Sequence, residues 1–174
     1  MKLLMLAAAL AAPSAPPPAS RPCLTEADAQ AVALVALPEI IRQTGVVCAT
    51  RLPASSLVRR TGGPFLAKYD AEADRAWPIA RAAITRMIDP MADVLLQSSY
   101  ARPVLTSLLV PQLVGRIEPA DCGTLDRLVT QLAPLPPRNT ASIIVTALAY
   151  FKAEKAKGKN VAVPDLPLCA GAGL

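Results

Sequence analysis

The stretch that decides the fold class is NTASIIVTALAYF, which runs from Asn139 to Phe151. Asn139 or Thr140 can cap the start of a helix, because either side chain can accept a hydrogen bond from an unpaired backbone N–H. Apolar residues then recur at helical spacing, namely Ile144, Ala147, Leu148 and Phe151. Lysines at the end complement the helix dipole, and Gly158 ends the pattern. The stretch predicts a helix that buries this apolar stripe.

The same period recurs upstream of that helix. One set of apolar residues fits the i, i+3, i+4, i+7 template of a helix face: Leu125, Leu128, Val129 and Leu132. A second apolar face precedes it: Leu105, Leu108, Leu109, Leu113 and Ile117. No stretch alternates convincingly with the period of two that indicates a strand. We therefore predict an all-α fold, a compact bundle of roughly six to seven helices.

The first predicted helix begins at Thr25, where Thr25 and Asp28 resemble a capping box. From there to Leu37 nearly every residue is apolar, which is typical of a helix that runs through a core. Pro38 can then open a second short helix, which Gly45 would end.

Prolines interrupt the later helical patterns too. Pro78 lies within a helical pattern that spans 70–87, and Pro111 lies within the apolar face described above. A proline in a helix removes one backbone hydrogen bond and kinks or breaks the helix. Asp89 and Pro90 repeat a helix start, with Asp as the cap and Pro in the first turn. We expect several helices to be interrupted by proline.

The first residues resemble a secretory signal. Lys2 precedes a short apolar run, Leu3 to Leu10, and small residues at Ala9 and Ala11 fit a peptidase site. We interpret residues 1–19 as a signal peptide and Pro-rich leader end, and residues 20–174 as a single helical domain. The run is too short for a membrane anchor, and no later segment spans a membrane without charge or proline. This predicts a periplasmic or extracellular protein; the alternative is an Ala/Pro tail on a cytosolic protein.

Four cysteines follow the leader: Cys23, Cys48, Cys122 and Cys169. In an exported chain they indicate two disulfides, for which three pairings are possible. We favour Cys23–Cys48 and Cys122–Cys169, because each would close a helical hairpin. A redox site would need Cys-x-x-Cys, and a four-cysteine zinc site would need close pairs. No two of these cysteines are closer than 25 residues in sequence.

Charge and composition disfavour several classes of protein. The formal net charge of +5 is mild, far from the concentrated basic surface of a nucleic-acid binder. The absence of histidine excludes a Ser-His-Asp triad and every histidine zinc site. Neither a nucleophile-elbow motif nor a phosphate-binding loop is present, so we predict no cofactor. A pair of carboxylates still needs no histidine, and Glu39, Glu72 or Glu118 are candidates for one.

Lys152, Lys155 and Lys159 form a basic cluster that would share one helix face if the helix continued past Gly158. Such a cluster can contact an anionic surface, although a solvated helix end is the alternative interpretation. We expect an exported binding or structural module with a protein or envelope partner, and we favour a non-enzymatic role. The alternatives are an exported hydrolase that uses acidic residues and a peripheral binder of the anionic cell envelope.

Overall fold

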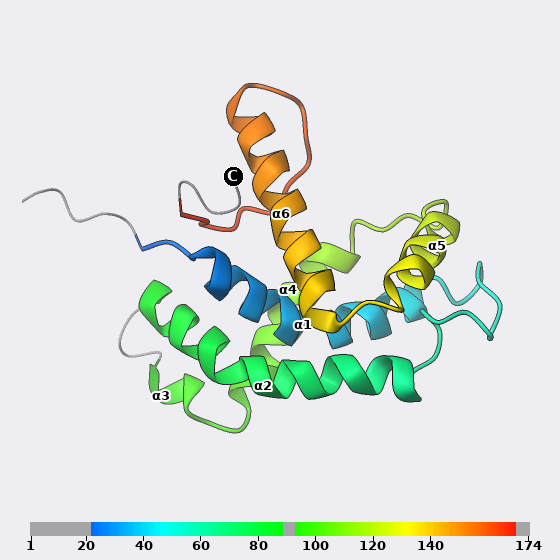
Figure 1. Ribbon diagram of the computed structural model, residues 1–174, viewed down its shortest axis with the longest axis horizontal. Helices are drawn as coiled ribbons and strands as arrows, with labels where there is room; N and C mark the ends of the chain where they lie inside the picture. Colours follow the sequence, from blue (N-terminus) through cyan, green and yellow to red (C-terminus); the bar gives the residue numbers. More distant parts are fainter. Residues whose placement is uncertain (1–21, 89–92, 170–174) are drawn as a thin grey trace, which may run out of the picture.

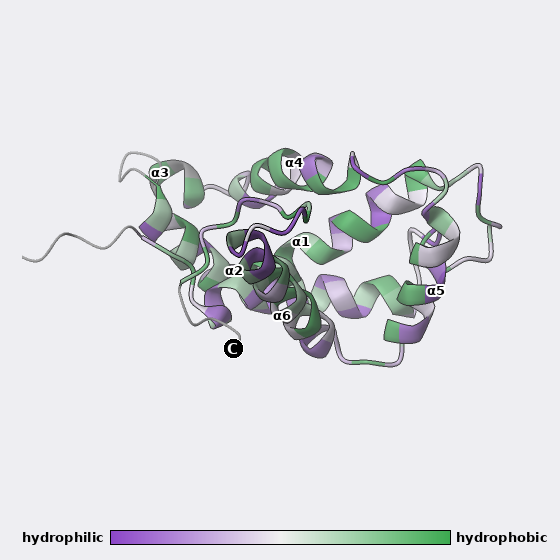
Figure 2. Cartoon of the chain, turned by 90° about the horizontal axis from the view of Figure 1, so that it is seen from above, coloured by the Kyte–Doolittle hydropathy of each residue, from purple (hydrophilic) through white to green (hydrophobic). Residues whose placement is uncertain are grey.

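Helix α1, Glu26–Val47, is the central element of the chain. The computed structural model describes residues 22–88 and 93–169. In it, α1 packs against α2 (Pro64–Met87), α4 (Ala101–Val114) and α6 (Pro137–Ala156) (Figure 1). Because α1 is apolar on nearly every side, it can bury contacts with all three neighbours at once. The view from above shows α4 on one side of α1 and α6 on the other (Figure 2).

The all-helical prediction is confirmed. The described residues form five helices of at least 11 residues, which is slightly fewer than the six to seven expected. Besides the four helices named above, the fifth long helix is α5 (Cys122–Leu132). The short α3 (Asp93–Leu96) adds a single four-residue turn. Within the described ranges no strand forms, and one isolated bridge joins Leu24 to Leu168. The predicted start at Asp89 and Pro90 and the predicted leader lie outside those ranges.

The prolines do not divide the helices as expected. Pro38, Pro78 and Pro111 lie inside α1, α2 and α4, which continue through them. Each proline removes one backbone donor, but the hydrogen bonds on both sides of it remain. Burial of the surrounding helix outweighs this cost, and Pro38 is itself fully buried. The predicted second helix after Pro38 is therefore wrong.

Gly45 also lies inside α1 rather than at its end. A side chain at this position would collide with the backbone carbonyl oxygen of Val58. The glycine therefore lets the loop after α1 pass directly against the helix. It is a close-packing position, whereas the sequence pattern had indicated a helix stop.

The predicted capping box at the start of α1 is confirmed. The carboxylate of Asp28 accepts a hydrogen bond from the backbone N–H of Thr25 at 3.0 Å, and the Thr25 hydroxyl accepts one from the Asp28 N–H at 3.2 Å. Asp28 also forms an ion pair with Arg86 of α2 at 2.7 Å. One carboxylate thus caps α1 and joins it to α2.

Helix α6 buries a different stripe from the one predicted. Its buried residues include Ala141, Val145 and Ala149, and Phe151 is 44% exposed. The predicted caps are also wrong, because α6 already begins at Pro137. Thr140 lies within the helix, and its hydroxyl is 3.3 Å from that of Tyr69. The other predicted stripe residues, Ile144, Ala147 and Leu148, are half-buried.

Two disulfides form, as predicted, but the favoured pairing is wrong. The bonds join Cys23 to Cys169 and Cys48 to Cys122. Because α1 runs unbroken for 22 residues, it holds Cys23 and Cys48 about 33 Å apart at its opposite ends. A disulfide needs Cα atoms within about 7 Å. The pairing error therefore follows from reading Pro38 as a helix boundary.

Candidate functional site

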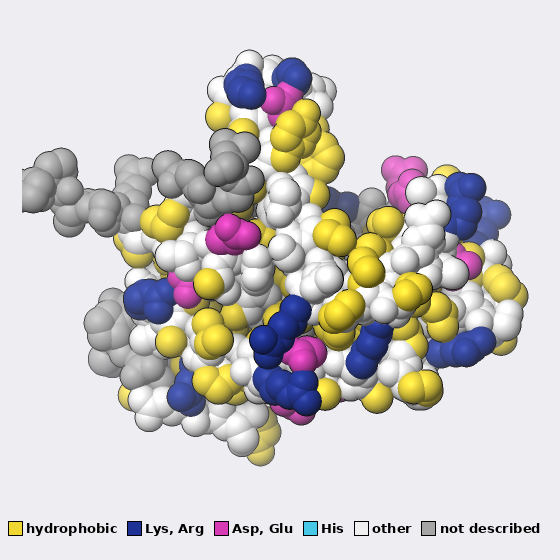
Figure 3. Space-filling model, in the orientation of Figure 1, with side chains coloured by type: hydrophobic (Ala, Val, Ile, Leu, Met, Phe, Trp, Pro, Cys, Tyr) yellow, Lys and Arg dark blue, Asp and Glu magenta, His cyan; other side chains and the backbone are white. Residues whose placement is uncertain are grey.

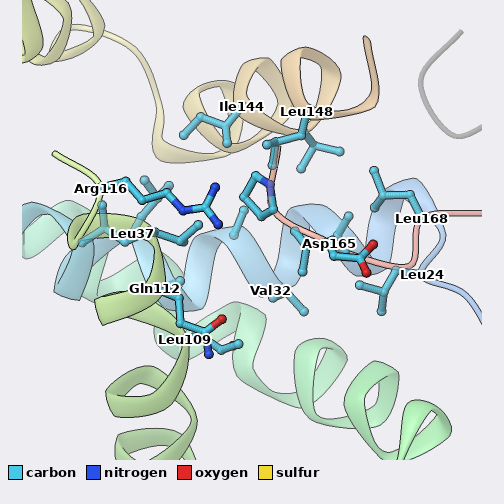
Figure 4. A pocket seen from close by; sticks show the side chains of 18 residues that line it. Leu24, Val32, Leu37, Leu109, Gln112, Arg116, Ile144, Leu148, Asp165 and Leu168 are labelled. Atoms are coloured by element: carbon cyan, nitrogen blue, oxygen red, sulfur yellow. The ribbon is translucent and has the colours of Figure 1, made fainter. Parts of the chain in front are cut away.

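A cavity of about 330 Å³ lies between α1, α4, α6 and the segment after α6 (Figure 4). Its walls are mostly apolar side chains from these elements, among them Leu37, Leu109, Ile144 and Leu148. Cavities of this size and character are the usual sites for small molecules in proteins.

Helix α1 forms one wall of the cavity. The wall residues recur at helical spacing and three of them are alanines: Ala29, Val32, Ala33, Ala36, Leu37 and Ile40. Alanine covers the helix backbone without filling the space above it. The alanine-rich composition of α1 therefore keeps the cavity open while preserving a strong helix former.

A second wall is the segment Val163–Cys169, which we call the strap. The disulfide Cys23–Cys169 ties its end to the residues before α1. The backbone N–H of Leu24 donates to the Pro167 carbonyl at 2.7 Å, and that of Cys169 donates to the Leu24 carbonyl at 2.9 Å. The Nζ of Lys152 on α6 donates to the carbonyl of Leu166. These contacts hold the strap against the cavity without regular secondary structure.

Three polar side chains line the otherwise apolar cavity: Gln112, Arg116 and Asp165. Gln112 lies on α4, Arg116 lies just after its end, and Asp165 lies on the strap. Figure 4 shows the Arg116 guanidinium reaching from the α4 side toward the strap. It forms no ion pair with any carboxylate of the described residues. The cavity therefore presents a cation that no carboxylate of residues 22–88 and 93–169 neutralises.

No protein family, curated protein or solved structure matches this chain. Its function must therefore be argued from its own geometry. No group of three or more metal-binding side chains occurs among residues 22–88 and 93–169. Across the same residues, each helix is too short or too polar to pass through a bilayer.

The predicted basic cluster is not one continuous helix face. Helix α6 ends at Ala156, so Lys159 lies beyond it. Lys157 and Lys159 both form ion pairs with the buried Glu154, and Lys152 contacts the strap. Hydrogen bonds from Lys159 and Lys157 lower the pKa of Glu154 below its usual value. Figure 3 shows this end of α6, where acidic atoms lie between basic ones. Lys155 is exposed, and a contact with an anionic surface stays a prediction.

The three candidate carboxylates lie apart from the cavity. The Oε2 of Glu39 lies 3.7 Å from the Nη1 of Arg42, and Glu118 is exposed. Glu72 forms ion pairs with Arg75 and Arg138, and the hydrogen bond from Arg138 is the main cause of its lowered pKa. A general acid needs a raised pKa, so this environment does not suit Glu72 to that role. None of the three lines the cavity, whose described walls carry Asp165 as their carboxylate.

The cavity and its polar residues were not predicted from the sequence. The apolar face predicted over 105–117 did include two residues that line the cavity, Leu109 and Leu113. A usable signal lay on that face, because Gln112 and Arg116 are one helical turn apart and lie beside those leucines. The segment that covers this face cannot be predicted from the neighbouring sequence, because the strap lies about fifty residues downstream.

Proposed function

We propose that the chain is an exported binding protein that holds a small, largely apolar molecule in the cavity beneath the strap. The cavity itself supports this function. Its volume of about 330 Å³ falls within the range of small-molecule sites, and its walls are mostly apolar with few polar groups. Each buried methylene of a ligand contributes about 0.8 kcal/mol to binding, so a short hydrocarbon chain is enough for useful affinity.

Export to the periplasm or the exterior is part of this proposal. The sequence of residues 1–19 supports it, as do the two disulfides, because disulfides persist in oxidising compartments. The binding domain would then comprise residues 20–174. The hydrolase alternative has less support, because the described cavity walls hold one carboxylate where two would be needed.

A dye-binding experiment tests the function. The protein is exported to the periplasm of an expression host, purified and titrated with the neutral apolar dye N-phenyl-1-naphthylamine. We expect saturable fluorescence enhancement that Ala33→Phe strongly weakens, because Ala33 lines the cavity and the phenylalanine ring would take up space that the dye needs. The matched control is Ala82→Phe on the exposed side of α2, which should bind like the parent protein. Equal binding by the Ala33→Phe and parent proteins, or none by the parent, contradicts the proposal.

Contact with an anionic envelope through Lys152, Lys155 and Lys159 is a separate prediction. Sedimentation with phosphatidylglycerol vesicles at low and high salt tests it, because salt screens charge attraction. Of the three lysines only Lys155 is both exposed and without a carboxylate partner among the described residues. Lys155→Gln should therefore reduce any such binding more than Lys152→Gln does.

A further inference from the structure

We propose that the ligand is an amphipathic anion, an aliphatic chain that ends in one carboxylate. Its carboxylate would lie against Arg116 and Gln112, and its chain would run along α1 toward Leu24 and Leu168. This inference rests on the proposed function, because it names the class of molecule that the same cavity holds.

The first argument is the unpaired charge of Arg116. Several other arginines have carboxylate partners, among them Arg42 with Asp70, Arg86 with Asp28 and Arg102 with Asp74. Arg116 has none among the described residues, and the stretch 94–117 contains no acidic residue. A guanidinium offers a planar fork of donors that matches a carboxylate. Arg116 is itself exposed, so its guanidinium lies at the rim of a cavity whose remaining walls are mostly apolar.

The second argument is the position of Gln112. It lies four residues before Arg116, so the two side chains lie one helical turn apart along the same wall. Its amide can donate a second hydrogen bond to the same acid group. The two donors define one polar end of a cavity whose remaining walls are mostly apolar.

The third argument is the position of Asp165, which sets the orientation of the ligand. Asp165 lies on the strap, nearer to Leu24 and Leu168 than Arg116 is, as Figure 4 shows. Its carboxylate is exposed and stays solvated at the rim. It repels an anion from that end, so the acid group is directed to Arg116 and the chain occupies the apolar space beneath the strap.

Displacement of the dye by three matched ligands tests the inference. Decanoate, decanol and decylamine share one chain and differ in the charge of the head group. Near neutral pH, we expect decanoate to bind about tenfold or more tighter than decanol. A hydrogen bond to a charged group contributes enough binding free energy for a difference of that size. Decylamine should bind more weakly than either.

Two charge variants assign the effect to its residue. Arg116→Gln should reduce the preference for decanoate over decanol to about twofold or less. Circular dichroism and urea unfolding, which do not depend on the cavity ligand, show whether the variant folds. Asp165→Asn, the matched control, should retain or increase decanoate affinity.

The outcomes separate this inference from the proposed function. If dye and decanol bind but decanoate has no advantage, or keeps it in Arg116→Gln, the anion proposal is wrong and the binding function survives. Tighter binding of decylamine that Asp165→Asn removes also overturns it, since the ligand would then be a cation. If neither dye nor any of the three ligands binds, the proposed function fails as well.

Discussion

The two ends of α1 are each closed by a disulfide, but the surroundings of the two bonds differ. At the cavity end, Cys23 and Cys169 are half-buried, and backbone hydrogen bonds join Leu24 to the strap on either side of the bond. At the far end, Cys48 and Cys122 are 0% and 1% exposed and pack with Leu52 and Val58. One end is therefore held by many polar contacts, and the other by a bridge inside a small core.

Helix α5 explains the need for the buried bridge. Of its residues only Cys122 is buried, and Leu128 on its apolar face is 47% exposed. Outside the disulfide it is held by few contacts, among them the hydrogen bond from the Ser56 hydroxyl to Asp126 at 2.5 Å. A short helix with so little buried surface has little stability of its own. The far end therefore depends on its disulfide for structure, whereas the strap end has other support.

Removal of each disulfide in turn should have the largest effect on stability and tests the difference between the two ends directly. Cys48→Ala with Cys122→Ala should lower the free energy of unfolding by about 4–5 kcal/mol, from the loop-closure term for a separation of 74 residues. The loss of buried sulfur atoms adds to this figure. Urea unfolding measures the change, and hydrogen exchange should show early loss of protection across α5.

The matched pair is Cys23→Ala with Cys169→Ala. Loop closure alone would make this bond slightly more stabilising, because its separation is 146 residues. We nevertheless expect the smaller loss, since Cys23 and Cys169 are half-buried, whereas removal of the fully buried Cys48 and Cys122 sulfur atoms also leaves space in a core. A strap variant less stable than the Cys48–Cys122 variant would contradict the comparison.

The close passage of the loop over Gly45 gives a second test at the far end. Gly45→Ala should lower the free energy of unfolding by about 1–3 kcal/mol, because the new methyl group collides with the Val58 backbone. Gly62→Ala is the control, since nothing lies within 4 Å of a side chain there. Chemical denaturation of both variants should place Gly62→Ala near the parent. Equal stability of the two would show that the loop moves aside freely.

At the cavity end, Asp28 makes a pH-dependent contribution. Burial raises the pKa of Asp28, but hydrogen bonds from Thr25 and Arg86 outweigh it and leave the pKa below its ordinary value of 3.8. The folded pKa is thus lower than the unfolded one, so the stabilisation is complete above the unfolded value and is lost as the pH falls through the folded one. Asp28→Asn should cost about 1–2 kcal/mol at neutral pH. Denaturation at several pH values should show this difference shrinking below about pH 4.

Glu72→Gln is the control for Asp28→Asn. It removes a half-buried carboxylate with a lowered pKa from α2. It should cost less at neutral pH, because its partners Arg75 and Arg138 are exposed and the solvent screens both ion pairs. If Glu72→Gln lowered the free energy of unfolding at neutral pH as much as Asp28→Asn does, the capping carboxylate would contribute no more than the ion pairs of Glu72.

The helical class and the capping of α1 could be predicted because both are local. Period and cap residues lie within a few positions of one another, as at Thr25 and Asp28. The continuity of α1 could not be predicted, because a proline at position 38 locally indicates a helix boundary. Burial against three neighbouring helices overrides that signal.

The cavity could be anticipated only in part. The apolar face that contains Leu109 and Leu113 was visible as a pattern, but a pattern does not show what it faces. The strap reaches the cavity through the pairing of Cys23 with Cys169, and disulfide connectivity cannot be deduced from spacing. The strap's contribution therefore became visible only in three dimensions.

The contact between Lys152 and the strap carries the smallest predicted effect. Lys152→Met keeps most of the side-chain volume but leaves the Leu166 carbonyl without its donor, which should cost about 0.5–1 kcal/mol. The loss should be local, so hydrogen exchange at the Leu168 and Cys169 amides should speed up while that of α5 stays unchanged. Lys155→Met, from an exposed position on the same helix, is the control and should alter neither region. If Lys152→Met leaves strap exchange at the parent rate, the disulfide and the Leu24 hydrogen bonds hold the strap by themselves.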